Sequence, residues 1–596
     1  MHLLDYGILA AYLIVLVGKS LLLAKKAAGG SDDYFLAGKK MPWWALGASG
    51  MSSNLDAAGT MTIIALIYTY GLHGFFIEMR GGVVLPIAVF LAFMGKWHQR
   101  SNVVTTGEWM HLRFGTAAPG KAARFTAAVT YLIVTVGMIV FFLAAAGPFL
   151  AAIVPWSATQ CQVVMALAAL MYTMISGLYG VIWTDVVQAG LIAFAAVYVA
   201  VLATGYVDAD LLAQWPGATY NQAIPELISG LGNPVDGQTY YAPFLLFLLF
   251  WAGKGILEGL GGSGGSAYMA QRFYASQDIP TVKKLCMLWT VLFAFRWPMV
   301  LGFAILAIHL GVGRDNPEVI LNRVLMSDLF PIGIRGLLVT AIFAASMSTF
   351  DSTINAGASY VVRDIWLPLR RGSSPRQQVL VGYVASALIV AAGLAIALSI
   401  PEGVVRVWVT IVVQFFPAFL LPFALRWFWS RFNGWGFTAG VASGFGAAVG
   451  LLFIPGPEAL GLPSELSVLI QNDAFTDVFI LGSVGLASLI GCLLGTFATA
   501  EVDEPTLRAF YRQIRPLGLW PSEWKRPDAA EHRGDIRRLV VAVVWQISTF
   551  LLPMCAMLRM WSATSVLGVV WLVTGLILLR DVQDGGPDAA LSGGRV

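Results

Sequence analysis

Charged residues are scarce in this chain. Lys, Arg, Asp and Glu make up 12% of the 596 residues, whereas hydrophobic residues make up 58%. A soluble chain of this length would divide into several domains with polar surfaces, so this balance excludes that class and indicates a polytopic membrane protein. The net charge is only +4, and the basic residues fall in short segments between apolar runs. We therefore interpret them as topology signals and not as a nucleic-acid-binding surface.

Cysteine and histidine are also rare. The cysteines lie in apolar segments without paired spacing, which excludes a disulfide framework or a thiolate metal site; they are Cys161, Cys286, Cys492 and Cys555. The six histidines are dispersed, and we find no zinc-protease pair, phosphate-binding loop or dinucleotide fingerprint. The segment GGSGG at 261–265 matches the pattern of a hydrolase nucleophile elbow. That motif needs a strand before it, whereas here it interrupts an apolar run, so we expect no enzyme.

Long apolar runs are what the sequence has in abundance. Fifteen of them are long enough, or nearly so, to cross roughly 30 Å of hydrocarbon, and we expect each to form a membrane helix. They span residues 5–23, 44–66, 78–96, 122–153, 160–178, 184–206, 241–262, 285–311, 328–361, 377–400, 403–427, 436–455, 475–499, 538–558 and 562–580. The first run lacks the basic leader of a signal peptide, which favours a retained helix with its amino end outside.

The distribution of positive charge predicts the orientation in the membrane. With the amino end outside, segments 95–124, 271–284, 363–376 and 500–537 fall inside, and all are rich in Lys or Arg. The longest outside loop, about 207–240, contains neither. We therefore expect a multi-pass protein of the cell (inner) membrane with a cytoplasmic carboxyl end. The mixed charges of EPTLRAFYRQIRPLGLWPSEWKRP, within segment 500–537, fit a short helix and loop at the membrane surface, but a solvated linker to two peripheral helices is the favoured interpretation.

Two apolar segments are interrupted by small residues. They are GASGMSSNLDAAGT (47–60) and GKGILEGLGGSGGSAY (253–268), and they lie five crossings apart. Paired broken helices at matching positions indicate a secondary transporter built from inverted repeats. This predicts a transport core at 44–430 with repeats at about 44–206 and 241–427. The flanking parts are an extra helix and loop at 1–43 and peripheral helices at 431–596.

Polar residues gather on one face of the apolar segment FAASMSTFDSTINA (343–356). Ala345, Ser348, Thr349 and Ser352 follow the i, i+3, i+4, i+7 spacing of a helical stripe, and Asp351 lies beside it. Hydroxyls could instead bond back to their own helix or hold two helices together. An ionisable group at membrane depth costs on the order of 3 kcal/mol, however, and usually serves function. Such hard oxygen ligands indicate an alkali cation site.

Three motifs together resemble those of the sodium/solute symporters, which include sugar, proline, sialic-acid, pantothenate and iodide carriers. The motifs are DYFLAGKKMPWW (33–44), GLYGVIWTDVVQ (177–188) and FAASMSTFDS (343–352), and the similarity covers residues 1 to about 430. The resemblance implies an all-α polytopic membrane protein with a five-plus-five inverted-repeat core of the leucine-transporter type. One extra helix would precede this core and four would follow it.

The resemblance also implies ion sites. The family's main sodium site is built from backbone carbonyls at the break in the first core helix, which correspond here to Ser52 and Leu55. An alanine carbonyl and two hydroxyls on the eighth core helix complete it, and they correspond to Ala345, Ser348 and Thr349. A second candidate site, for sodium or a proton, corresponds to Asp185, Ser348, Asp351 and Ser352. Several relatives have serine where this chain has Asp351. Two acids close together either bind a cation firmly or share a proton.

Candidate substrate residues are the remaining polar groups near the broken helices. They are Asn54, Asp56, Glu78, Arg80, Lys254, Glu258 and Arg296. Lys254 and Glu258 stand at i, i+4 and could simply neutralise each other. Glu78 and Arg80 lie two apart and cannot face each other on a helix. Sugar carriers of the family have aromatic residues where this chain has GLGGSGGSAY, so their sugar contacts cannot be transferred.

These observations favour a sodium-coupled symporter that moves a small polar organic solute by alternating access, with Na+ as coupling ion. Sugars and organic acids are the favoured substrates. Proton coupling is the alternative within the same fold, and a transport-related sensor is the alternative from another class. A channel would need a continuous polar lining on several helices. We expect the chain to function as a monomer in the lipid bilayer, without nucleic acid.

Overall fold

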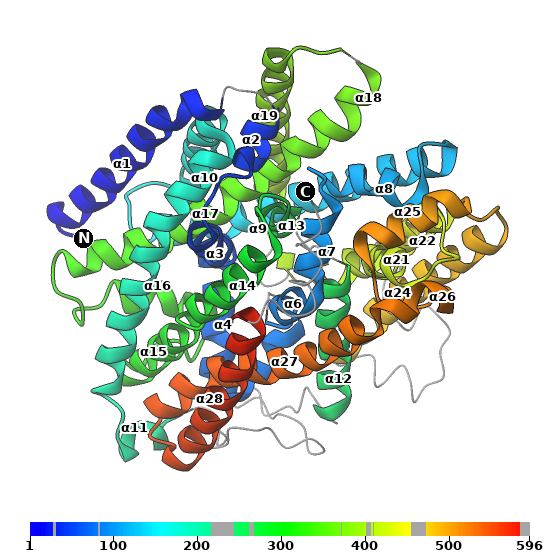
Figure 1. Cartoon of the computed structure of the whole chain (residues 1–596). Coiled ribbons are helices and arrows are strands. Elements are labelled where there is room, and N and C mark those ends of the chain that lie inside the picture. The colour runs from blue at the N-terminus through cyan, green and yellow to red at the C-terminus, as the bar shows by residue number, and fades with distance from the viewer. Residues whose placement is uncertain are drawn as a thin grey trace.

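The computed structural model describes residues 1–27, 31–80, 84–215, 244–261, 267–370, 372–400, 407–408, 410–453 and 473–583. Within these ranges the regular elements are all helices (Figure 1). Eleven of the described helices are long and apolar enough to cross a membrane, and two shorter apolar helices accompany them. The membrane class is therefore confirmed, whereas the count of fifteen crossings stays a prediction. The number of helices long enough to cross a membrane is lower than fifteen partly because a broken helix consists of two halves, each too short to cross the membrane alone.

The first repeat begins with a broken helix. Its halves are α3 (Trp43–Ser52) and α4 (Ala57–Tyr70), and residues 53–56 between them are not helical. The remaining elements of this repeat are α5 (His73–Ile77), η2 (Glu78–Arg80), α6 (Pro86–Val89), η3 (Phe90–Met94), α7 (Gly95–Ser101), α8 (Thr106–Phe114), α9 (Ala118–Ala151) and α10 (Ala158–Thr204).

A kink at Gly177 divides α10 where two separate helices are predicted. Gly177 has φ 52° and ψ −155°, a conformation that L side chains rarely adopt. A Cβ at this position would lie 2.7 Å from the backbone oxygen of Tyr34. The chain therefore turns at this glycine without a loop, and the fifth and sixth predicted crossings are confirmed as two spans, Ala158–Ile175 and Gly177–Thr204, on either side of it.

The second repeat has the same plan. Its predicted broken helix contributes α12 (Phe244–Leu260) and α13 (Ala267–Tyr274), and the glycine-rich residues 262–266 between them lie outside the described part. The remaining elements are α14 (Ile279–Phe293), α15 (Arg296–His309), η4 (Pro317–Val319), α16 (Ile320–Leu325), α17 (Ile334–Tyr360), η5 (Val361–Trp366), α18 (Leu367–Leu369), α19 (Pro375–Ser399), η6 (Thr410–Phe415) and α21 (Pro417–Phe428).

Helix α17, which carries the polar stripe, is the centre of the molecule. In the most apolar stretch of the span Ile334–Leu369, 94% of the residues are buried. The corresponding figure for α28 (Trp561–Gln583) is 17%. It packs against α9, α10, α19 and α1 (Leu3–Ala27), which shield it from lipid. A membrane helix can carry many hydroxyls only when neighbouring helices cover them.

Asp5 of α1 fixes the amino end of α17. Its carboxylate oxygen Oδ1 accepts hydrogen bonds from the backbone N–H groups of Gly333, at 2.7 Å, and Gly336, at 2.9 Å. A carboxylate at this end also complements the positive end of the helix dipole. The extra first helix therefore positions the helix that bears the predicted ion site.

The carboxyl-terminal helices divide between two sides of the core. Helices α22 (Gly434–Leu452) and α24 (Asp473–Phe497) pack on α9 and α21, whereas α27 (Ala529–Met557) packs on α6, η3 and α15. Lys96 of α7 lies 2.5 Å from Glu531 and 2.7 Å from Asp535 of α27. These buried ion pairs join the last helices to the first repeat.

The segment between these helix pairs is not a solvated linker. Its helix α25 (Glu504–Ile514) packs against α8 and α7, and Phe510 and Ile514 are fully buried. Two short elements follow, α26 (Ser522–Lys525) and η8 (Arg526–Asp528). The predicted short helix is therefore present, but its apolar face is covered. Alternation of charged and apolar residues at helical spacing is the signal that the linker interpretation overlooked.

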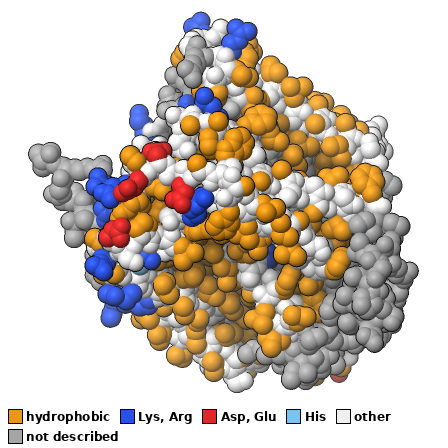
Figure 2. All heavy atoms as spheres, turned by 90° about the vertical axis from the view of Figure 1, so that its right-hand side faces the viewer, with side chains coloured by type: hydrophobic (Ala, Val, Ile, Leu, Met, Phe, Trp, Pro, Cys, Tyr) orange, Lys and Arg blue, Asp and Glu red, His pale blue; other side chains and the backbone are white. Residues whose placement is uncertain are grey.

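The outer surface fits a membrane environment. Figure 2 shows hydrophobic side chains spread across one broad face, with charged side chains gathered towards its edges. Large hydrophobic residues are exposed on several helices, for example Leu388 at 65% and Leu494 at 66%. In water such a surface would drive aggregation, so it belongs against lipid.

Candidate functional site

The residues of the predicted main sodium site come together where α17 crosses the break between α3 and α4. The Thr349 hydroxyl lies 3.2 Å from the carbonyl oxygen of Leu55 and 3.2 Å from that of Ala345. The Ser348 hydroxyl lies 3.1 Å from the hydroxyl of Ser52. Ser52 thus contacts α17 through its side-chain hydroxyl, whereas the resemblance implies that its backbone carbonyl is the sodium ligand. All five residues are buried.

The chemistry of this cluster suits a monovalent cation. Its atoms are carbonyl and hydroxyl oxygens from two elements, and they are close enough to hydrogen-bond with one another. Neutral oxygen donors are hard ligands, while divalent ions such as Ca²⁺ are usually bound with several carboxylates. The cluster can therefore hold an alkali ion between α17 and the broken helix.

The predicted second site is also assembled, but with an unexpected member. Asp185 of α10 accepts a short hydrogen bond from Ser348 through Oδ1 and another from Ser49 through Oδ2. The guanidinium of Arg272, on α13, lies 2.6 Å from the Ser352 hydroxyl and 3.4 Å from Asp185 Oδ2. Asp351 Oδ2 accepts a hydrogen bond from Tyr172 at 2.8 Å. Arg272 is absent from the sequence-based prediction because segment 271–284 was interpreted as an exposed cytoplasmic loop.

Two serines outside the prediction complete the contacts of the broken helix. The Ser53 hydroxyl lies 2.8 Å from that of Ser352, and the backbone N–H of Ala57 donates to Ser346 at 2.9 Å. Their signal in the sequence is weak, because serine is frequent in both segments.

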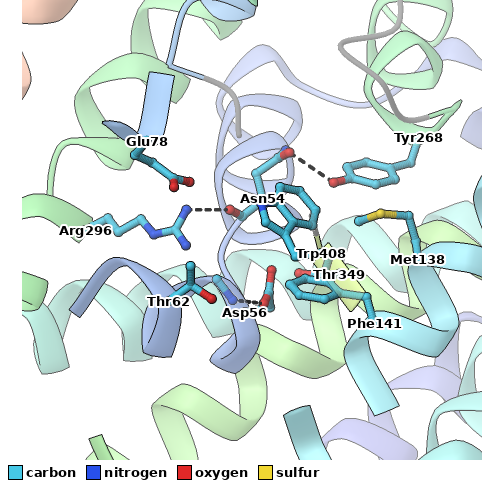
Figure 3. Close-up of a pocket in the computed structure, with 11 residues that line it drawn as sticks. Asn54, Asp56, Thr62, Glu78, Met138, Phe141, Tyr268, Arg296, Thr349 and Trp408 are labelled. Atoms are coloured by element: carbon cyan, nitrogen blue, oxygen red, sulfur yellow. Dashed lines mark hydrogen bonds between the residues drawn. The ribbon is translucent and has the colours of Figure 1, made fainter. Parts of the chain in front are cut away.

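A polar pocket lies beside the main site (Figure 3). Thr349 lines this pocket as well as the ion cluster, so the two share a side chain. The full lining is Asn54, Asp56, Gly59, Thr62, Glu78, Met138, Phe141, Tyr268, Arg296, Thr349 and Trp408. The pocket therefore collects residues from the break in the first broken helix, from its second half α4, and from both predicted repeats.

Hydrogen bonds hold the polar wall of the pocket in place. Arg296 Nη1 lies 3.4 Å from the backbone oxygen of Asn54, whose side-chain oxygen accepts from Tyr268 at 3.0 Å. Asp56 Oδ1 accepts from the backbone N–H of Gly59 at 2.6 Å and so caps α4. Figure 3 shows the Glu78 carboxylate and the Arg296 guanidinium pointing towards one another.

The structure separates the predicted substrate residues into two groups. Asn54, Asp56, Glu78 and Arg296 line the pocket. Lys254 and Glu258 are not among the lining residues; both are buried on α12, where Nζ and Oε1 are 2.5 Å apart. The side chain of Arg80 lies outside the described part of the chain.

The apolar and aromatic wall was missed by sequence reasoning. It includes Phe141 and Met138 of α9, Tyr268 of α13 and Trp408. Apolar residues in a membrane helix look alike in sequence whether they face lipid, core or ligand, so no signal distinguishes them.

The described residues resemble known transporters in sequence and in structure. The model of the sodium:solute symporter family matches residues 34–444. The sodium/sialic acid symporter NanT of Aliivibrio fischeri is 25% identical over 408 residues, covering 66% of this chain and 75% of the relative. Sodium/glucose cotransporter 4 of Danio rerio is 24% identical over 566 residues, covering 84% of this chain and 80% of the relative.

A solved structure supports the same fold. It is the substrate-bound, outward-open state of a Na+-coupled sialic acid symporter, with a TM-score of 0.65 and 20% identity, covering 84% of this chain and 99% of that one. This likeness confirms the five-plus-five fold, and the family match together with the relatives confirms the class of a Na+-coupled membrane transporter. With a family match over more than two thirds of its residues, the chain belongs to the sodium:solute symporter family.

Proposed function

We propose that this transporter carries a small, net-neutral polar solute, with a sugar favoured over an organic acid. Na+ is held by Ser52, Leu55, Ala345, Ser348 and Thr349. The observation that carries this proposal is the shared residue Thr349, whose hydroxyl reaches Leu55 and whose side chain also lines the polar pocket. An ion bound to this hydroxyl lies next to the solute, so each stabilises the binding of the other.

The charges around the pocket favour a neutral solute. Asp56 and Glu78 bring two negative charges and Arg296 one positive charge, so one Na+ beside Thr349 balances the set. A carboxylate solute would add an uncompensated negative charge beside residues that are buried. A neutral solute with several hydroxyl groups can instead donate to Asp56 and Glu78, because carboxylates only accept.

The aromatic wall suits the same class of solute. Phe141, Tyr268 and Trp408 offer flat apolar surfaces opposite the charged side of the pocket. Ligand sites commonly combine such surfaces with a few polar groups that fix orientation. A sugar presents both an apolar face and a ring of hydroxyls.

The proposed cycle follows from the position of the ion. Na+ draws the Leu55 carbonyl and the α17 hydroxyls into one coordination shell, which favours the conformation in which the broken helix lies against α17. The solute then enters beside this shell. When the broken helices move away from α17, the shell is divided and both Na+ and solute leave on the other side.

Orientation and assembly are parts of the same proposal. The amino terminus lies outside the cell (inner) membrane and the carboxyl terminus lies in the cytoplasm, as the Lys and Arg distribution favours. The chain functions as a monomer, because the pocket and the ion cluster are each lined within one chain.

A thermal-shift screen tests the proposal. Purified protein is heated in NaCl or in KCl of equal ionic strength, with neutral sugars, zwitterionic amino acids or monocarboxylates. We expect Na+ to raise the melting temperature and neutral sugars to raise it further only in NaCl. Equal stabilisation in KCl, or a response to carboxylates alone, would contradict the proposal. Uptake of a labelled hit into proteoliposomes then distinguishes a carrier from a sensor, and a response to pH in place of Na+ would indicate proton coupling.

A further inference from the structure

A larger cavity lies at the first turns of α9, where the Lys- and Arg-rich segments 95–124 and 363–376 meet. Its volume is about 840 Å³, within the range of ligand sites, and its walls come from α8, α9, η5 and α18. None of its lining residues belongs to the polar pocket of Figure 3, so the proposed transport cycle does not use it. The titratable side chains that line it are Glu108, His111, Lys121, Arg124, Arg363 and Asp364.

The lining of this cavity carries a surplus of one positive charge. Arg363 Nε lies 2.8 Å from Glu108 Oε1, and Arg124 Nε lies 2.8 Å from Asp364 Oδ1, so each carboxylate is paired with one guanidinium. Lys121 is exposed and forms no ion pair within the described part of the chain. Three basic side chains against two carboxylates therefore leave a net charge of +1.

His111 does not alter this balance. Burial, together with the nearby charges of Arg124 and Lys121, lowers the pKa of His111 to about 4. Its ring is therefore neutral at pH 7. The cavity is thus suited to a ligand with a single negative charge, and Lys121 offers the ammonium group that such a ligand can contact.

Apolar side chains form the rim of the cavity. Phe125 is 58% exposed and Leu369 is 77% exposed, and both line the cavity beside the charged groups. Large exposed apolar residues at the end of a membrane helix belong against lipid. The charged cavity therefore opens where lipid headgroups meet hydrocarbon, and basic cavities between membrane helices at this depth are typical headgroup sites.

An apolar stripe leads along α9 from this rim into a groove. Phe125, Val129, Leu132, Ile133 and Val136 follow i, i+4, i+7, i+8, i+11 spacing on one face, and each is at least partly exposed. The groove, of about 550 Å³, begins at Leu132 and is completed by apolar residues of α19, η6 and α22. The helix from Phe125 to Val136 rises about 16 Å, close to half of the roughly 30 Å hydrocarbon core. The groove thus lies at the depth that the acyl chain of a lipid reaches from the cavity.

We propose that this cavity binds the phosphodiester headgroup of one anionic phospholipid, such as phosphatidylglycerol, and that an acyl chain of the same lipid follows α9 into the groove. The single negative charge of the phosphodiester matches the net charge of the lining. The proposed orientation places this end of α9 in the cytoplasmic leaflet, whose anionic lipids attract basic groups. The lipid is a resident ligand and not the transported solute, so its binding needs neither Na+ nor solute.

Native mass spectrometry of the delipidated full-length protein tests the headgroup site. The protein is titrated with phosphatidylglycerol or with phosphatidylcholine of the same acyl chains, and we expect one phosphatidylglycerol to bind more tightly than phosphatidylcholine. K121Q should weaken phosphatidylglycerol binding about fivefold and K121E about 25-fold, with phosphatidylcholine unaffected. R376E is the matched control, because Arg376 is exposed on the first turn of α19 and does not line the cavity.

A second variant tests the acyl-chain groove independently of charge. Gly137 lines the groove, and the nearest atoms to a Cβ built there belong to Ile411 at 3.7 Å, an ordinary contact. G137L therefore fills the groove without forcing the helices apart. It should weaken phosphatidylglycerol binding about tenfold, the contribution of two buried CH₂ groups. G190L is its control, because Gly190 is exposed on α10 and a Cβ there meets nothing within 4 Å.

Four results would overturn the inference. Equal affinities for phosphatidylglycerol and phosphatidylcholine would remove the headgroup selectivity, and equal losses in K121E and R376E would indicate general surface charge. Full competition by water-soluble glycerol 3-phosphate or inorganic phosphate would assign the cavity to a soluble anion. Unchanged affinity in G137L would overturn the placement of the acyl chain. Each result leaves the Na+-dependent melting and uptake assays untouched, so failure of the lipid site and failure of the proposed function are distinguishable.

Discussion

Replacing Thr349 by valine tests the ion site at its centre. Valine keeps the shape of threonine but lacks the hydroxyl, which lies 3.2 Å from both Leu55 O and Ala345 O and belongs to a side chain that is 1% exposed. An oxygen that contacts a charge is worth about 1.5–3 kcal/mol, and about 1.4 kcal/mol corresponds to a tenfold change in affinity. We therefore expect T349V to weaken Na+ binding about 10- to 150-fold.

Two further variants make the result specific. T349S keeps the oxygen and should stay within about threefold of wild type, since a lost methyl group changes no ligand. T353V removes a buried hydroxyl one turn later, which bonds back to Thr349 O at 2.7 Å. This control removes a similar polar group from the same helix and contacts only the backbone oxygen of Thr349, which is not one of the proposed ligand atoms, so Na+ affinity should change little. Affinity is measured from the Na+ dependence of the melting temperature, with K+ keeping ionic strength constant.

Two results would refute the reasoning. Wild-type Na+ affinity in T349V would mean that the ion binds elsewhere. Equal weakening in T349V and T353V would mean that the effect comes from packing of α17 in general. In KCl, T349V should lose only about 1 kcal/mol of stability, the typical contribution of one hydrogen bond.

Three other substitutions follow from the same structure. R296M should reduce solute affinity at least tenfold, measured as the solute-induced thermal shift in NaCl, because the two pocket carboxylates lose their counter-charge. G177A should destabilise the fold by about 1–3 kcal/mol, because the new Cβ would lie 2.7 Å from Tyr34 O at positive φ. G190A on the same helix meets nothing within 4 Å and should leave the melting temperature nearly unchanged. D5A should cost about 1–2 kcal/mol of unfolding free energy through loss of the cap on α17, with D5N closer to wild type in the same melting assay.

Local patterns were enough to predict the polar stripe of α17 and the break in the first core helix, and the family resemblance paired the two as a sodium site. The i, i+3, i+4, i+7 spacing places Ala345, Ser348, Thr349 and Ser352 on one face, and helical geometry guarantees this wherever the helix forms. Small and polar residues before Leu55 likewise marked the break. Both signals lie within a few residues of sequence, so they needed no knowledge of tertiary contacts.

The pocket required information that local patterns do not contain. Phe141, Tyr268 and Trp408 come from three distant segments, and only packing brings them to Asn54 and Arg296. The i, i+4 spacing of Lys254 and Glu258 was enough to predict their ion pair. It could not show that neither residue lines the pocket, because that depends on packing between distant segments.

Basic residues show where topology rules are too coarse. Counting Lys and Arg between apolar runs treats each as an exposed charge, yet Arg272 and Lys96 are both buried. Arg272 meets Asp185 across 87 residues of sequence, and Lys96 meets Glu531 across 435. A buried cation requires an acidic partner, because an unpaired one would cost several kcal/mol, but sequence alone does not say which of many acids supplies it. A basic residue at the end of an apolar run therefore has two meanings, a topology signal or half of a buried pair. In this chain Lys96 and Arg272 both have the second meaning.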